Sequence, residues 1–85
     1  QKDLALLGIE IKQISLSPMK IRKIRERARV SQTVFAKLLN VSPSSVRQWE
    51  QGKRRPSGST MVLLELLERS PHLLDYRLEN RASGN

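Results

Sequence analysis

The size and charge of the chain limit the functions that it can have. Its 85 residues suffice for one small domain with a modest core and are too few for a large enzyme cleft. Sixteen Lys and Arg residues against eight Asp and Glu give a net charge of +8, and the excess lies within residues 1–56. We therefore expect a partner that is a polyanion, such as a nucleic acid.

The residue types argue against several other classes of protein. The chain has no Cys and a single His, so a disulfide framework, a thiolate metal site and a His-based catalytic set are not expected. There is no Gly-rich phosphate loop, and no apolar run approaches the roughly 20 residues that span a bilayer. We expect a cytoplasmic protein that is not an enzyme and needs no metal or cofactor, with His72 at the start of a helix.

Residues 1–16 are expected to form an extended segment or linker ahead of the domain. Residues 9–12 alternate between apolar and polar, as a strand does, and Ile14 and Leu16 continue the pattern in the opposite phase. A bulge would absorb that slip in a strand. An irregular linker fits the same residues, so both alternatives stay open.

A first helix is predicted from residue 18 to about residue 28. Ser17 can cap it and Pro18 fits its first position, where a missing N–H costs nothing. Ile21 and Ile24 are three residues apart and are expected to face the core.

Two short helices joined by a tight turn follow. The first is predicted over 32–39, with Phe35 buried and the small Ala36 at the closest approach to the second helix. Asn40 suits the left-handed conformation that such a turn needs. The second helix is predicted over 43–51.

The second helix has clear start and stop signals. Ser42 caps it, Pro43 occupies its first position, and Gly52 ends it in a left-handed conformation. Val46 and Trp49 are three residues apart and are predicted to face inward, which argues against stacking of Trp49 on a base. Two helices in this arrangement form a helix-turn-helix, and DNA becomes the leading candidate partner.

The outward face of the second helix is polar and is followed by a basic loop. Its side chains can donate hydrogen bonds to base edges, and we predict base contacts by Ser44, Ser45, Arg47 and Gln48. Phosphate contacts are predicted for Gln32, Ser42, Gln51, Lys53, Arg54 and Arg55. The alternative for each group is an ordinary solvated surface.

Two further helices are predicted after the basic loop. The first begins at Ser57 to Thr60 and carries more Leu residues than one narrow core stripe needs, so part of it is expected to meet a second subunit. The predicted dimer contacts are Met61, Leu64 and Leu67. The second covers roughly residues 71–78, with Leu74 and Leu78 inward, and residues 80–85 are expected to fray.

The central residues carry a resemblance to a known family. The run from Ser31 to Lys53, followed by Pro56, resembles the phage-repressor helix-turn-helix family called Cro/C1 or XRE. Residues 17–74 are similar to the DNA-binding domains of HigA-type antitoxins from bacterial toxin–antitoxin operons. The resemblance implies an all-α, five-helix, lambda-repressor-like domain over residues 17–79, flanked by the extended segment 1–16 and the tail 80–85.

The resemblance also implies a function and a structural ion pair. It indicates a repressor that binds an inverted-repeat DNA operator as a homodimer and autoregulates a toxin–antitoxin operon. The second partner would be an mRNA-cleaving toxin of the HigB/RelE type, with residues 1–16 as the candidate binding segment. The second helix of the motif, predicted over 43–51, is called the recognition helix. In this family an arginine of the first helix pairs with a glutamate near the end of the recognition helix, and the matching residues are Arg25 and Glu50.

Two alternatives fit the same fold. One is a free-standing regulator of the phage-repressor type without a toxin. The other is a protein-interaction module that has lost DNA binding, which acidic or bulky apolar residues on the recognition helix would signal. The Ser, Arg and Gln side chains found there favour DNA.

Overall fold

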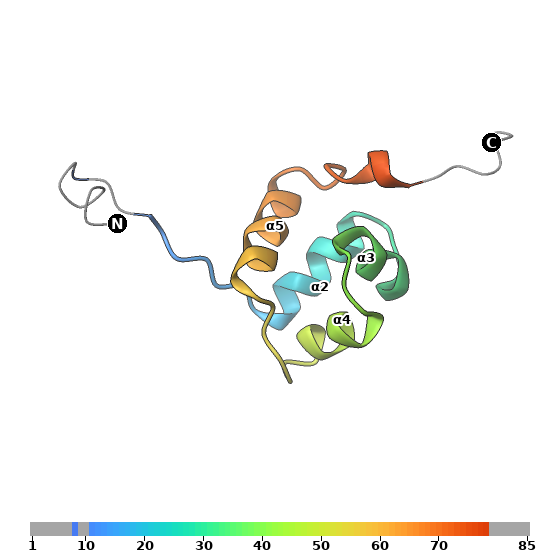
Figure 1. The fold of residues 1–85 in the computed structure, drawn as a ribbon, viewed down its shortest axis with the longest axis horizontal. Coiled ribbons are helices and arrows are strands. Elements are labelled where there is room, and N and C mark those ends of the chain that lie inside the picture. Colours follow the sequence, from blue (N-terminus) through green and yellow to red (C-terminus); the bar gives the residue numbers. More distant parts are fainter. Residues whose placement is uncertain (1–7, 9–10, 79–85) are drawn as a thin grey trace, which may run out of the picture.

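The described part of the chain is built from helices packed on one another. The computed structural model describes residue 8 and residues 11–78, and it contains no strand in this range. The elements are α2 (Pro18–Arg27), α3 (Gln32–Leu39), α4 (Pro43–Glu50), α5 (Gly58–Arg69) and a 3-10 helix, η1 (Asp75–Arg77). Figure 1 shows α2 at the centre, with α5 on one side and the α3–α4 pair on the other.

Each α-helix begins after a serine that caps it. The serine hydroxyl accepts a hydrogen bond from the backbone N–H three residues later, which satisfies one donor that has no partner within the helix. The capping residues are Ser17, Ser31, Ser42 and Ser57. In α2 and α4 the next residue is proline, as predicted.

The turns between helices depend on left-handed residues. Asn40 has φ +59° and its N–H donates to backbone carbonyls of α3, so the chain reverses at once into α4. Gly52 has φ +75° and ends α4, as predicted. Arg29, with φ +62°, takes the same conformation between α2 and α3, although no residue pattern there predicted it.

The core lies where α2, α3, α4 and α5 meet. Its buried side chains are Ile21, Ile24, Phe35, Ala36, Leu39, Val46, Trp49, Leu64 and Leu67. Ala36 is fully buried, which fits its predicted place between the two motif helices. Trp49 is a core residue, so its ring supports α4 from behind.

The predicted fifth α-helix over 71–78 is wrong. Residues 71–74 form turns, and the short η1 follows, so His72 lies in a turn and contacts Asp75. Only Leu74 packs against the core, whereas Leu78 is exposed. A short helix depends on burying an apolar face, and one half-buried leucine offers too little.

The expectations for the two ends of the chain fall only partly on described residues. Residues 11–16 lead into α2 without regular structure, and residues 9 and 10 of the possible strand lie outside the described range, as do residues 80–85. Arg77, beyond α5, donates to the carbonyl of Leu38 at the end of α3. Among the described helices, none is long and apolar enough to cross a membrane.

Candidate nucleic-acid interface

Helix α4 is held from behind and presents a polar face outward. Val46 and Trp49 are buried against the neighbouring helices, which fixes how α4 is rotated about its axis. Among the predicted base-contact residues, Ser44 and Arg47 are exposed, and Ser45 and Gln48 are half-buried. The structure therefore brings these four side chains to one side of α4.

Three hydrogen bonds organise the polar face and the start of α4. Gln48 Nε2 donates to Ser44 Oγ over 3.1 Å, so two predicted base readers are joined to each other. The Ser42 and Ser45 hydroxyls lie 3.0 Å apart, and Ser42 also accepts from the backbone of Ser45. The hydroxyl of Ser42 therefore caps the helix. A phosphate could use only the hydrogen-bonding capacity that these two contacts leave over.

The basic loop after α4 is anchored through its backbone. The N–H groups of Lys53 and Arg54 both donate to the carbonyl of Gln48, at 2.9 and 3.3 Å. The side chains of the loop are exposed. The exposed cationic side chains are therefore carried by a turn whose backbone is hydrogen-bonded to the last turn of α4.

Arg55 makes a contact that the sequence did not indicate. Its Nη2 donates to Ser15 Oγ over 2.8 Å, which joins the N-terminal lead to the basic loop. A groove of about 460 Å³ lies between these segments, with Pro18, Trp49 and Arg54 among its lining residues. The two partners are forty residues apart in sequence, so no local pattern could have revealed the contact.

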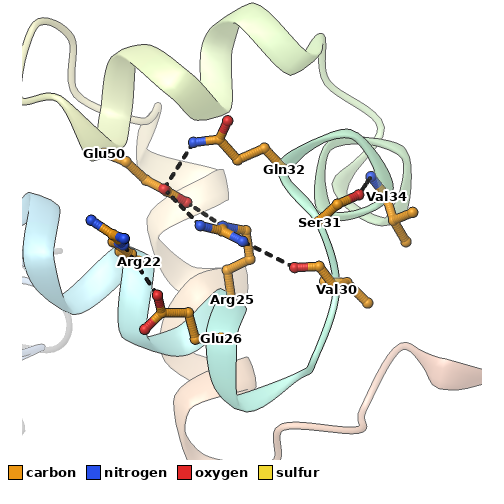
Figure 2. Close-up of polar contacts among 8 residues, drawn as sticks. All are labelled: Arg22, Arg25, Glu26, Val30, Ser31, Gln32, Val34 and Glu50. Atoms are coloured by element: carbon orange, nitrogen blue, oxygen red, sulfur yellow. Dashed lines mark hydrogen bonds and ion pairs between the residues drawn. The ribbon is translucent and has the colours of Figure 1, made fainter.

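An ion pair locks α2 to the end of the recognition helix. Arg25 Nε lies 2.6 Å from Glu50 Oε2, and Arg25 Nη2 lies 3.1 Å from Glu50 Oε1 (Figure 2). Arg25 Nη1 donates to the Val30 carbonyl over 3.0 Å. The side chains of Arg25 and Glu50 are only 14% and 5% exposed. The two-pronged geometry fixes orientation as well as distance.

The pKa values of this pair move apart. Burial opposes ionisation of Glu50, but hydrogen bonds from Arg25 and Gln32, with the charge of Arg25, outweigh it and hold the pKa of Glu50 below its usual value. The hydrogen bond to Glu50 raises the pKa of Arg25 against the opposing effect of burial. Both side chains are therefore charged at neutral pH.

Gln32, which was predicted only as a phosphate contact, takes part in this network. Its Nε2 donates to Glu50 Oε1 over 3.0 Å, and Figure 2 shows the amide turned toward that carboxylate. The remaining N–H of the amide keeps the predicted phosphate contact chemically feasible. The sequence offered one signal for this contact, which was a glutamine in the first turn of one motif helix and a glutamate at the end of the next.

The residues predicted as dimer contacts lie in the core of the single chain. Met61, Leu64 and Leu67 are 6%, 0% and 3% exposed. They cannot serve as a dimer surface, because the chain's own helices already cover them. The apolar residues that α5 turns outward are Val62 and Leu66, at 49% and 45% exposed.

Comparison with known proteins agrees with this geometry. The helix-turn-helix family profile matches residues 21–67, which span α2 to α5. Antitoxin HigA-2 of Vibrio cholerae serotype O1 is 37% identical over 70 residues, which cover 82% of this chain and 67% of that protein. The chain therefore belongs to the helix-turn-helix family of DNA-binding proteins, as a HigA-type antitoxin and repressor.

Proposed function

We propose that the chain represses its own operon by binding an inverted-repeat operator as a homodimer, and that it neutralises an mRNA-cleaving toxin of the HigB/RelE type. The observation that carries this proposal is the rigid support of α4, whose polar face stands opposite buried Val46 and Trp49. Similarity to an antitoxin supports the toxin as second partner. The mode of action is binding, without catalysis.

The DNA contacts divide into two groups. Base edges are read by the outward side chains of α4, namely Ser44, Ser45, Arg47 and Gln48. Phosphates are held by the basic loop and the polar residues at the helix ends, namely Gln32, Ser42, Gln51, Lys53, Arg54 and Arg55. The loop supplies affinity, and α4 supplies sequence preference.

The dimer contact is assigned to the outward face of α5. Val62 and Leu66 lie one helical turn apart, and both are exposed. A second copy that covers them would join two DNA-binding helices in one assembly, as an inverted-repeat operator requires. Residues 1–16 remain the candidate toxin-binding segment.

A gel shift with the DNA upstream of the chain's own gene tests the repressor function. The protein should retard that DNA more strongly than a duplex of equal length and random sequence. Coexpression with the product of the adjacent gene tests the antitoxin function. Growth should stop without this chain and recover with it. Specific retardation without any toxic neighbour would favour a free-standing regulator, and no retardation would favour a protein-interaction module.

A further inference from the structure

The hydrogen bond between Ser44 and Gln48 defines a compact unit on the recognition helix. The residues are four apart, so they lie one above the other on the same side of α4. Gln48 Nε2 is 3.1 Å from Ser44 Oγ. Ser44 is exposed and Gln48 is half-buried, which leaves both accessible to a ligand that approaches this face.

We propose that Ser44 and Gln48 read neighbouring base pairs as one coupled unit, with Gln48 selecting adenine and Ser44 selecting a base that presents an acceptor. The inference rests on the proposed DNA-binding function of α4. It adds that the preference at one base pair depends on the side chain that reads the other.

The amide of Gln48 fixes the first half of the preference. A glutamine amide has two N–H donors and one oxygen acceptor, and Ser44 uses one donor. One donor and one acceptor remain, which match N7 and the N6 amino group of adenine. Guanine presents only acceptors at N7 and O6, so its O6 would face the amide oxygen of Gln48.

The hydroxyl of Ser44 fixes the second half. Because its oxygen accepts from Gln48, its hydrogen is available to donate to the DNA. Thymine O4 and guanine N7 or O6 are acceptors on the major-groove edge. A cytosine at this position offers an amino donor instead and satisfies the hydroxyl less well.

The internal hydrogen bond also explains why the two readings are coupled. A free glutamine side chain loses rotamer freedom when it binds, and this loss weakens binding to every base. The contact with Ser44 orders the side chain of Gln48 before DNA arrives and sets which edge of the amide faces outward. Without Ser44, the amide can turn over and present its groups in the reverse order.

Selection from a duplex pool randomised over about 20 base pairs tests the proposal, because that length holds two half-sites one helical turn apart. The wild-type chain, Ser44→Ala, Ser44→Thr and Gln48→Ala are each used for selection. The base pair at which Gln48→Ala loses the most preference, and at which Gln48→Glu prefers cytosine, is the one that Gln48 reads. Ser59→Ala, an exposed change on α5, is the matched control and should select the wild-type sequence.

Ser44→Ala should lose preference at two base pairs, including the one read by Gln48. There the adenine preference should fall by about threefold to tenfold, a part of the discrimination that a bidentate contact provides. Ser44→Thr keeps the hydroxyl and should keep both preferences. Gln48→Glu has no amide donor and should change the preference from adenine to cytosine.

Two outcomes would overturn the inference. A Ser44→Ala chain that keeps full adenine preference at the Gln48 position would show that the residues read independently. A wild-type preference for guanine at that position would show that the assigned polarity of the amide is wrong. Failure of the proposed function itself looks different, because the wild-type chain would then enrich no sequence. Circular dichroism melting of each variant checks that the fold is retained.

Discussion

Glu50 accepts more side-chain hydrogen bonds than any other acidic residue in the described range. Its carboxylate accepts from Arg25 through both oxygens and from Gln32 through one, and it is almost entirely screened from water. These bonds join α2, the start of α3 and the end of α4. A single carboxylate thereby holds the recognition helix in place against two neighbours.

Removing this carboxylate should destabilise the fold strongly. Glu50→Ala leaves the guanidinium of Arg25 without its charged partner in a poorly hydrated site, so we expect a loss of about 3 kcal/mol in the free energy of unfolding. Urea denaturation measures it. Glu26→Ala is the matched control, because the Arg22–Glu26 pair is exposed and should cost less than about 0.5 kcal/mol. Equal losses for both variants would contradict a structural lock.

The same carboxylate should give the fold a pH dependence of defined sign. The pKa of Glu50 is lowered in the folded chain, so its stabilisation is complete above the ordinary value of about 4.5 and is lost as the pH falls through the folded value. The difference in unfolding free energy between wild type and Glu50→Gln should therefore shrink on acidification below about pH 4.5. A constant difference from neutral pH to about pH 3 would mean that the carboxylate contributes no charge-dependent stability.

Arg54 should contribute affinity without sequence preference. Its side chain is exposed, and the backbone of its loop is hydrogen-bonded to the last turn of α4. Arg54→Ala should weaken binding to the operator and to random DNA alike, and should reduce the slope of log affinity against log salt by about one. Arg69→Ala removes the same charge from the end of α5 and should leave the slope unchanged. A selective loss on the operator would make Arg54 a base reader.

At the scale of helices, the local signals explain which elements could be foreseen. A serine cap, a proline in the first turn and a left-handed Asn40 or Gly52 act within a few residues. The bounds of α2, α3 and α4 therefore agree closely with those predicted from the sequence. The segment after α5 has a serine and a proline too, at Ser70 and Pro71. It fails as an α-helix because its packing partners, which lie elsewhere in the chain, bury little of it.

The turn at Asn40 gives a test at this scale. Asn40→Ala forces a residue with a β-carbon and no local hydrogen-bonding side chain into the left-handed region, which should cost about 1 kcal/mol of unfolding free energy. Asn40→Gly should stay near the wild-type value, because glycine adopts this conformation without steric cost. Urea midpoints compare the two, with Lys37→Ala on the exposed side of α3 as control. Equal destabilisation by alanine and glycine would point to a role of the Asn40 side chain itself.

Contacts between distant segments set the limit of sequence reasoning about the site. The polar residues of α4 follow from its helical period, and the Arg25–Glu50 pair was suggested by family resemblance. The Ser44–Gln48 bond, the Gln32–Glu50 bond and the Arg55–Ser15 bond depend on side-chain rotamers and on how segments meet in space. Met61, Leu64 and Leu67 of α5 were misassigned because periodicity does not distinguish a side chain in the chain's own core from one on a dimer surface.

At the scale of the whole molecule, the proposed dimer determines the form of the operator. Two recognition helices must enter successive major grooves on one side of the duplex, with centres about 34 Å, or 10 to 10.5 base pairs, apart. Leu66→Glu places a charge on the outward face of α5 and should shift the chain toward monomer in sedimentation equilibrium. Met19→Glu, on an exposed position of α2, should leave the mass unchanged.

Footprinting completes the same test. The wild-type chain should protect two half-sites with this spacing, and Leu66→Glu should need a higher concentration to protect them. Protection of one isolated half-site by the wild-type chain would contradict the dimer. Unchanged mass for Leu66→Glu would move the contact away from this face of α5.

The mostly local packing of this helical fold has a consequence for the lifetime of the chain. Most contacts in the fold join residues that are close in sequence, as between α3 and its neighbour α4, although α2 also packs on α4 and α5. Folds of this kind form within about microseconds to milliseconds. When an opened chain closes faster than a protease cuts, degradation follows the equilibrium population of the open form. A partner that binds only the folded chain lowers that population, so the survival of each molecule depends on whether it is bound.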